Sequence, residues 1–339
     1  MVAFWVKISL ISLVKSKNKA IRIIVLLLKI AVAVVSIYIL YKAFYAEDKW
    51  KTLKLWFVSD FEKTDIIWLV YVLFGAILNW SIESKKWQVT ISSLEQISFS
   101  KAFETVLSAM TLSFLTPNRI GEFAARVLFI HNDLRSKALV VSAVSGFSQL
   151  LVVLIFGAIL FGFYQLAEMF PYFSAKLYWI LACALILLTF LAYLNLDKIQ
   201  YLLPQAFKKE KWLAFLEGFS YLKQKTLVIM FLISIGRYFV FLLQYYFIMR
   251  AFNVEIGFLN AIISVSILLF VQVVIPSFAF SEFAVRGAYA VLIFSFFGIN
   301  QIHAVIISYA IWLINILLPA LLGGIIFLTK KSDDLDLDM

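Results

Sequence analysis

Long apolar runs determine what this chain can fold into. Several of them approach or exceed the roughly 20 residues that a helix needs to cross a bilayer. Hydrophobic residues make up 63% of the 339 residues and charged residues 15%. Soluble domains average about 45–50% apolar and about 25% charged residues. The sequence therefore predicts an all-α polytopic membrane protein, and the water-soluble fold classes are excluded.

Six runs are predicted to cross the membrane completely. They are Ala20–Phe44, Asp65–Ile82, Lys137–Phe163, Ala175–Leu194, Thr226–Arg250 and Ile302–Leu328. Two further apolar regions, Lys101–Ile130 and Gly257–Gly298, are interrupted by Pro117 and Pro276. Proline lacks a backbone N–H and clashes with the preceding turn, so it breaks a helix. We expect two broken helical hairpins, whose halves either cross fully or turn back at mid-depth as re-entrant segments.

Loop charges orient these elements, because Lys and Arg collect on the cytoplasmic side of a membrane. They place the N-terminus, a loop at 195–225 and the C-terminus in the cytoplasm. The first hairpin then enters from the cytoplasmic side and the second from outside. We expect one transmembrane domain, 1–339, with inverted-topology repeats at about 65–163 and 226–328. In transporters of this kind, discontinuous helices at the repeat interface form the substrate site.

Each hairpin carries the same charged phrase, Glu-Phe-Ala-x-Arg, shortly after its proline. The Glu and the Arg are four residues apart, so they lie on one helix face. A helix that begins after the break offers free N–H groups and a positive dipole end to an anion such as phosphate. An internal salt bridge that closes each helix start is the alternative. The pairs are Glu122 with Arg126 and Glu282 with Arg286.

Two more arginines belong to the candidate set. Arg119 lies at the first break, where it can also be an interfacial side chain that extends to the membrane surface. Arg237 lies near the middle of the fifth predicted span, where an ion is costly unless it lines a cavity. Ser, Asn and Gln side chains on the spans can simply join helices by hydrogen bonds. The candidate substrate-binding residues are Arg119, Glu122, Arg126, Arg237, Glu282 and Arg286, and the expected hairpin breaks are Pro117, Gly121 and Pro276.

Composition argues against several other kinds of site. One cysteine and two histidines rule out an intrachain disulfide and a Cys-based metal site, and we expect no metal and no other cofactor. The net charge of +10 arises from loop lysines and arginines, which set topology and meet anionic lipid head groups. Membrane lipids are therefore the expected partners, and nucleic acid is not.

The first break resembles a known family. "FLTPNRIGEFAARVLFI" and, earlier, "NWSIESKKWQV" (Asn79–Val89) are similar to the lysylphosphatidylglycerol synthase transmembrane-region family of flippase-like membrane proteins. The resemblance covers nearly the whole chain. The residues that match the first family motif are Pro117, Arg119, Gly121 and Glu122.

The second motif of that family is usually rich in proline and glycine and ends in Glu. Here it reads "IPSFAFSEFAVRG", with Pro276 and Glu282 kept. Ser277, Ala279 and Ser281 replace the expected glycines. This departure bears on substrate choice or on loop flexibility.

The resemblance implies lipid translocation in a bacterial cytoplasmic (inner) membrane. In multidomain relatives, a cytoplasmic domain transfers lysine to phosphatidylglycerol. Because this chain ends at Met339, shortly after the last span, we expect no such reaction and no enzyme activity. Other relatives are associated with archaeal glycosylation and polyprenyl-linked sugars, which leaves the lipid open.

Three functions remain open. The first is a flippase or transporter for an anionic or zwitterionic phospholipid or a polyprenyl-phosphate-linked lipid. The second is a membrane-embedded lipid-modifying transferase with Glu122 or Glu282 as a base. The third is a non-transporting partner of a separate lipid synthase. Charges at both breaks of a predicted inverted repeat favour the first, and the oligomeric state is not predicted.

Overall fold

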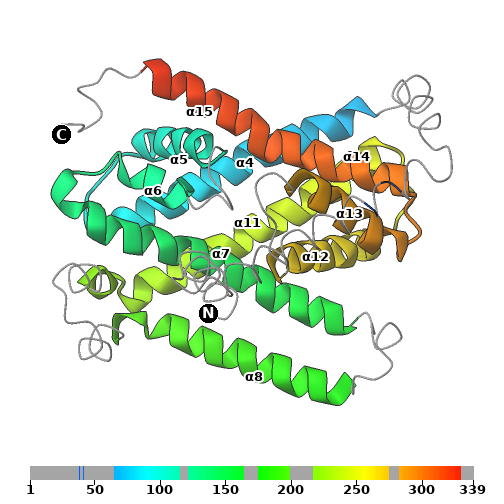
Figure 1. The fold of residues 1–339 in the computed structure, drawn as a ribbon, viewed down its shortest axis with the longest axis horizontal. Helices are drawn as coiled ribbons and strands as arrows, with labels where there is room; N and C mark the ends of the chain where they lie inside the picture. The colour runs from blue at the N-terminus through cyan, green and yellow to red at the C-terminus, as the bar shows by residue number, and fades with distance from the viewer. Residues whose placement is uncertain are drawn as a thin grey trace, which may run out of the picture. The chain divides into compact units, whose positions relative to one another are not determined.

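Helices are the regular elements of the computed structural model shown in Figure 1. The structure describes Tyr38, Tyr41 and residues 65–114, 121–163, 175–198, 217–274 and 282–329. Apart from Tyr38 and Tyr41, the predicted span Ala20–Phe44 lies outside the described residues, as does most of the predicted cytoplasmic loop. Within the described ranges every regular element is a helix, which confirms the all-α prediction.

Among the described residues, four helical stretches are long and apolar enough to cross a membrane. Except for α4, their main helices coincide closely with predicted spans, and α8 (Ala175–Leu194) has the predicted bounds. The chain is therefore an integral, multi-pass membrane protein. The four stretches comprise α4 (Ile66–Ile91), α7 (Arg135–Phe163), α11 (Gln224–Ala251), and α14 (Gln301–Trp312) with α15 (Leu318–Thr329).

The helix α4 is longer than predicted. The prediction ended this span at Ile82, whereas the helix continues through Glu83 and Lys86 to Ile91. The two charged side chains pair inside the protein, so they do not terminate the helix. Elsewhere α4 exposes large apolar side chains, among them Ile66 and Phe74, as expected of a helix that contacts lipid.

Two pairs of shorter helices occupy the regions predicted as broken hairpins. The first pair is α5 (Phe99–Phe114) with α6 (Gly121–Val127), and the second is α12 (Phe258–Val274) with α13 (Glu282–Ser295). The helices of each pair pack against one another. With 16 and 17 residues, α5 and α12 fall short of the roughly 20 residues of a typical span. Their re-entrant character stays a prediction.

The two predicted breaks fall outside the described residues, and Pro117, Arg119 and Pro276 lie there. Gly121, the third residue predicted at a break, is the first residue of α6. Glu282 is likewise the first residue of α13. The described parts of α6 and α13 thus begin next to the predicted breaks, and the breaks themselves stay a prediction.

The chain divides into two compact units, and each contains one hairpin. The α5–α6 unit comprises Ala76–Ile155, Ala167–Phe241 and Ile314–Met339. The α12–α13 unit comprises Met1–Gly75, Phe156–Leu166 and Leu242–Leu313. The helices α4, α7 and α11 each contribute a part to both units.

Close helix packing positions the first hairpin. A Cβ atom added to Gly323 of α15 would overlap the backbone oxygen of Leu107 in α5, so only glycine allows this approach. Beside it, Thr111 Oγ1 donates a hydrogen bond to the carbonyl oxygen of Ala320 at 2.5 Å. Small residues at such contacts are typical of membrane helices, which pack by shape rather than by expelling water.

The second hairpin packs through side chains. A Cβ atom added to Gly157 of α7 would lie 2.5 Å from Cβ of Phe270 in α12. The ring of Tyr245 meets that of Phe294 edge-on, with centroids 6.4 Å apart. This unit is thus built mainly from apolar and aromatic contacts.

Candidate functional site

One face of α4 is polar and buried. Asn79, Glu83, Lys86 and Thr90 follow one another at spacings of four, three and four residues, so they share a helix face. Their exposed fractions are 1%, 4%, 1% and 0%. Charged side chains are almost never buried to this extent unless they are paired. This face of α4 is therefore the centre of the candidate site.

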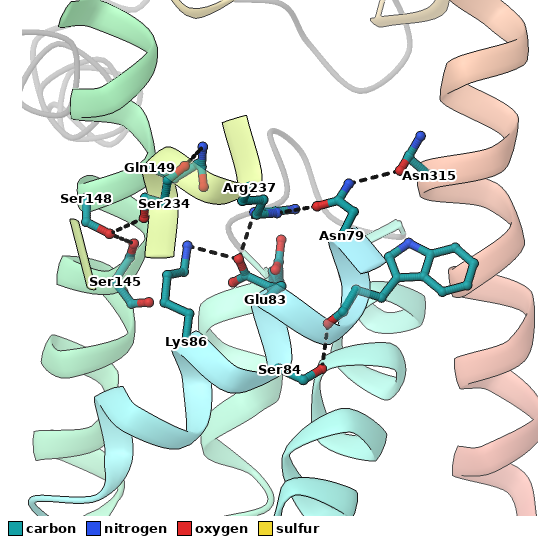
Figure 2. Close-up of polar contacts among 12 residues, drawn as sticks. Asn79, Glu83, Ser84, Lys86, Ser145, Ser148, Gln149, Ser234, Arg237 and Asn315 are labelled. Atoms are coloured by element: carbon teal, nitrogen blue, oxygen red, sulfur yellow. Dashed lines mark hydrogen bonds and ion pairs between the residues drawn. The ribbon is translucent and has the colours of Figure 1, made fainter. Parts of the chain in front are cut away.

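Glu83 accepts contacts from three cationic side chains. Lys86 Nζ lies 2.9 Å and Arg237 NH1 lies 2.7 Å from Oε2 of Glu83. Arg126 NH2 lies 2.8 Å from Oε1. Figure 2 shows Lys86 and Arg237 converging on Glu83. The carboxylate thus joins three helices, α4, α6 and α11.

Arg126 is the buried arginine of the first charged phrase. It pairs with Glu122, one turn earlier on α6, so the predicted internal salt bridge is present. Its guanidinium also lies over the ring of Trp87, 5.6 Å from the centroid. Its Nε has no hydrogen-bond partner among the described residues, although the side chain is buried. The arginine therefore does more than close a helix start, because it also carries a contact to α4.

Two side-chain amides, Asn79 and Asn315, form a hydrogen-bonded chain that ends at Nε of Arg237. Arg237 Nε donates to Asn79 Oδ1 at 2.6 Å, and Asn79 Nδ2 donates to Asn315 Oδ1 at 2.9 Å (Figure 2). Asn315 lies in a π-helical turn, Leu313–Leu317. Pro319 follows and lacks the N–H that would bond the carbonyl of Asn315, which accounts for the irregular turn. Such turns often occur at functional sites.

Hydroxyl groups join the surrounding helices. Ser148 of α7 and Ser234 of α11 share a hydrogen bond of 2.9 Å, and Gln149 Nε2 donates to the carbonyl oxygen of Ser234 at 3.3 Å (Figure 2). Thr90 of α4 donates to Ser145 of α7 at 3.3 Å. These contacts confirm that polar stripes on the spans join helices, and they fix α4, α7 and α11 around the ions.

The charged side chains form what we call the Glu83 cluster: Glu83, Lys86, Glu122, Arg126 and Arg237. Three cations meet two carboxylates, so the fully ionised cluster carries one net positive charge. Its members differ in exposure. Arg237 and Glu122 expose 19% and 21% of their side chains, whereas the other three are nearly inaccessible. The cluster is therefore partly accessible at these two residues.

Sequence reasoning placed six residues in the site, and the structure brings three of them together: Glu122, Arg126 and Arg237. Arg119 lies outside the described residues, and the side chain of Glu282 is likewise not described. Arg286 belongs to the α12–α13 unit, where its NH1 lies 3.5 Å from Oε1 of Gln272.

Glu83, Lys86 and Asn79 were missed as site residues. The predicted span ended at Ile82, so Glu83 and Lys86 fell outside it. The available signal was the spacing of Asn79, Glu83, Lys86 and Thr90, which aligns four polar residues along one helix face. In the described part of the chain, no group of three His, Cys, Asp or Glu side chains could hold a metal ion.

Comparison with known proteins agrees with this membrane architecture. A family model described as the lysylphosphatidylglycerol synthase TM region matches residues 26–323. No curated protein and no solved structure matches the chain. The match covers most of the 339 residues, including α4, both hairpins and the Glu83 cluster. The chain therefore belongs to the family of the lysylphosphatidylglycerol synthase transmembrane region.

Proposed function

We propose that this protein moves lipids with a phosphate-bearing, anionic or zwitterionic head group across a bacterial cytoplasmic membrane. The observation that carries the proposal is the Glu83 cluster, a buried group of ions with one net positive charge that is partly open at Arg237. The family is named after the membrane region of a lipid synthase, which agrees with a lipid as the ligand.

Physical chemistry favours an anion as the occupant. A charged residue at the centre of a membrane helix costs at least about 2.5–3.5 kcal/mol on insertion scales, and such residues mark ligand or ion pathways. The planar guanidinium of arginine matches phosphate oxygens in a two-point contact. The Glu83 cluster holds two arginines and carries one net positive charge in total, an arrangement that favours a phosphate group.

The proposed route uses both hairpins. The first helix of each hairpin, α5 or α12, is too short for a typical span, and the second, α6 or α13, starts at a charged phrase. We take the two hairpins as re-entrant elements of an inverted repeat. The lipid head group would pass beside these helix starts while its chains stay in the bilayer. Broken backbone at membrane depth is tolerated where it is buried in protein or lines a watery cavity.

The test is lipid movement in liposomes that contain the purified protein. Labelled phosphatidylglycerol, phosphatidylcholine, a polyprenyl phosphate and diacylglycerol are compared, the last because it lacks phosphate. We expect movement of at least one phosphate-bearing lipid above that in empty vesicles, and no movement of diacylglycerol. Arg237→Gln removes a charge-assisted contact worth about 1.5–3 kcal/mol, so we expect a roughly 10- to 100-fold loss.

Arg250→Gln is the matched control. Arg250 is an exposed arginine on the same helix, stacked over the ring of Trp68 at 5.9 Å, and it is not part of the Glu83 cluster. We expect near wild-type movement in this variant. If no labelled lipid moves, the proposal is wrong. Conversion of the lipid to a new product would indicate a transferase, and copurification of a stoichiometric synthase would indicate the partner role.

A further inference from the structure

Arg237 is the cation through which a ligand can enter the Glu83 cluster. Its side chain is 19% exposed, while that of Arg126 is 2% and that of Lys86 is 1% exposed. Its hydrogen bonds to described residues run from Nε to Asn79 and from NH1 to Glu83. A ligand that binds the forked end of this guanidinium therefore competes with Glu83 for NH1 and for its positive charge.

Glu83 can release Arg237 without becoming an unpaired buried charge. Its Oε2 contacts both Lys86 and Arg237, and its Oε1 contacts Arg126. If Arg237 turns to another anion, Lys86 and Arg126 remain within 2.9 Å of the carboxylate. This matters because a charge left alone in the interior is strongly destabilising.

Asn79 keeps the guanidinium in place during such an exchange. Its Oδ1 accepts from Nε of Arg237, and its amide nitrogen is anchored on Asn315. With Nε held, NH1 and NH2 form the edge that can bind two phosphate oxygens side by side. The anion-binding edge is thus presented by Asn79 and covered by Glu83.

We propose that Glu83 is an internal counter-anion that holds Arg237 in the empty protein and gives up this guanidinium to the phosphate of the bound lipid. The inference rests on the proposed function for the nature of the ligand. Glu83 then acts as a positioning residue, and it makes lipid binding reversible because carboxylate and phosphate compete for one guanidinium.

Lipid binding to the full chain in detergent tests this competition. The probe is short-chain phosphatidylglycerol, titrated by native mass spectrometry, with short-chain diacylglycerol as the uncharged comparison. Glu83→Gln keeps the size of the side chain and removes its charge. We expect about tenfold tighter phosphatidylglycerol binding together with slower movement in liposomes, because the exchange partner is lost. A purely structural role would weaken both.

Two further variants test whether tighter binding comes from lost competition for Arg237, from the changed net charge or from misfolding. Glu95→Gln raises the net charge of the protein by the same amount but removes a contact to Lys101, outside the Glu83 cluster, so we expect a change below about threefold. Glu83→Asp keeps the buried charge beside Lys86 and shortens its reach toward Arg237, so we expect folded protein with several-fold tighter binding.

The tighter binding must also depend on Arg237. In Arg237→Gln, the added Glu83→Gln change is expected to give no gain. The inference is overturned if Glu83→Asp binds no more tightly than wild type, if Glu95→Gln matches Glu83→Gln, or if the gain persists without Arg237. These binding measurements do not require lipid movement. They can therefore contradict the role of Glu83 while the liposome assay supports the proposed function, and they can support that role while the liposome assay contradicts the function.

Discussion

The two hairpins carry the same charged phrase but place its arginine in different surroundings. In the α5–α6 unit, Arg126 is buried against Glu83, Glu122 and Trp87. In the α12–α13 unit, Arg286 is half-buried and has a long contact with the amide of Gln272. The two arginines have different surroundings mainly because different helices pack against the hairpins: α4 against the first and α11 against the second.

The facing helices differ at one comparable position. Glu83 lies 39 residues before Glu122, and Gln244 lies 38 residues before Glu282, so an amide stands at nearly the spacing where the first half has a carboxylate. Gln244 is fully buried and donates to the carbonyl oxygen of Val72 at 3.0 Å. If the chain is an inverted repeat, as we propose, its two halves have diverged, and the first concentrates the ions.

The largest effect is expected from removing the charge of the two arginines. Arg126→Met leaves Glu122 without its described partner and Glu83 with one cation fewer, so it should lower the free energy of unfolding by about 3 kcal/mol. Arg286→Met, at a half-buried position, should lower it by less than about 1 kcal/mol. Denaturant unfolding in one detergent, followed by tryptophan fluorescence, gives both values. Equal losses would mean that the two hairpins use their arginines in the same way.

A smaller difference is expected where each hairpin packs on a glycine. Gly323→Ala drives Cβ into the backbone of α5, which cannot rotate away, whereas Gly157→Ala meets the Phe270 side chain. We expect losses of stability of about 3 kcal/mol and about 1 kcal/mol, within the usual range for overpacking. Thermal unfolding of both variants checks the order.

Gly236→Ala on α11 is the control for these glycine variants. A Cβ atom there meets nothing within 4 Å, so alanine should be neutral or should stabilise the helix by about 0.5–1 kcal/mol. If Gly157→Ala proves more damaging than Gly323→Ala, the second hairpin is the more tightly packed one and the comparison must be reversed.

The sequence was sufficient to predict most helices, because long apolar runs and prolines act locally. The bounds of α8 were predicted correctly, and helices begin at Gly121 and Glu282, after the predicted breaks. The end of α4 was wrong for a physical reason. Charged residues usually mark a membrane boundary, but Glu83 and Lys86 compensate each other inside the fold.

The site was predictable only in part for the same reason. A charge pair four residues apart, such as Glu122 with Arg126, is visible in the sequence because it depends on helix geometry alone. The meeting of Glu83 with Arg126 and Arg237 joins positions 43 and 154 residues apart. No local pattern determines which of several buried ions will share a carboxylate, since that choice is made by tertiary packing.

The smallest effects are expected from replacing the two buried amides, Asn315 and Gln244. The two variants test whether each amide is coupled to the charged side chains of the Glu83 cluster. Asn315→Leu removes the anchor of Asn79, which holds Arg237, so we expect a loss of about 1–2 kcal/mol in stability and a several-fold slower lipid movement.

Gln244→Met removes one hydrogen bond but also Oε1, which has no partner among the described residues. The free energy lost with the hydrogen bond and the free energy gained by removing an unpaired buried oxygen nearly cancel. We therefore expect the stability to change by less than about 0.5 kcal/mol and lipid movement to be unaltered. Unfolding and liposome assays on the same preparations provide the measurement. Slower movement in Gln244→Met would place the α12–α13 unit in the lipid path as firmly as the Glu83 cluster.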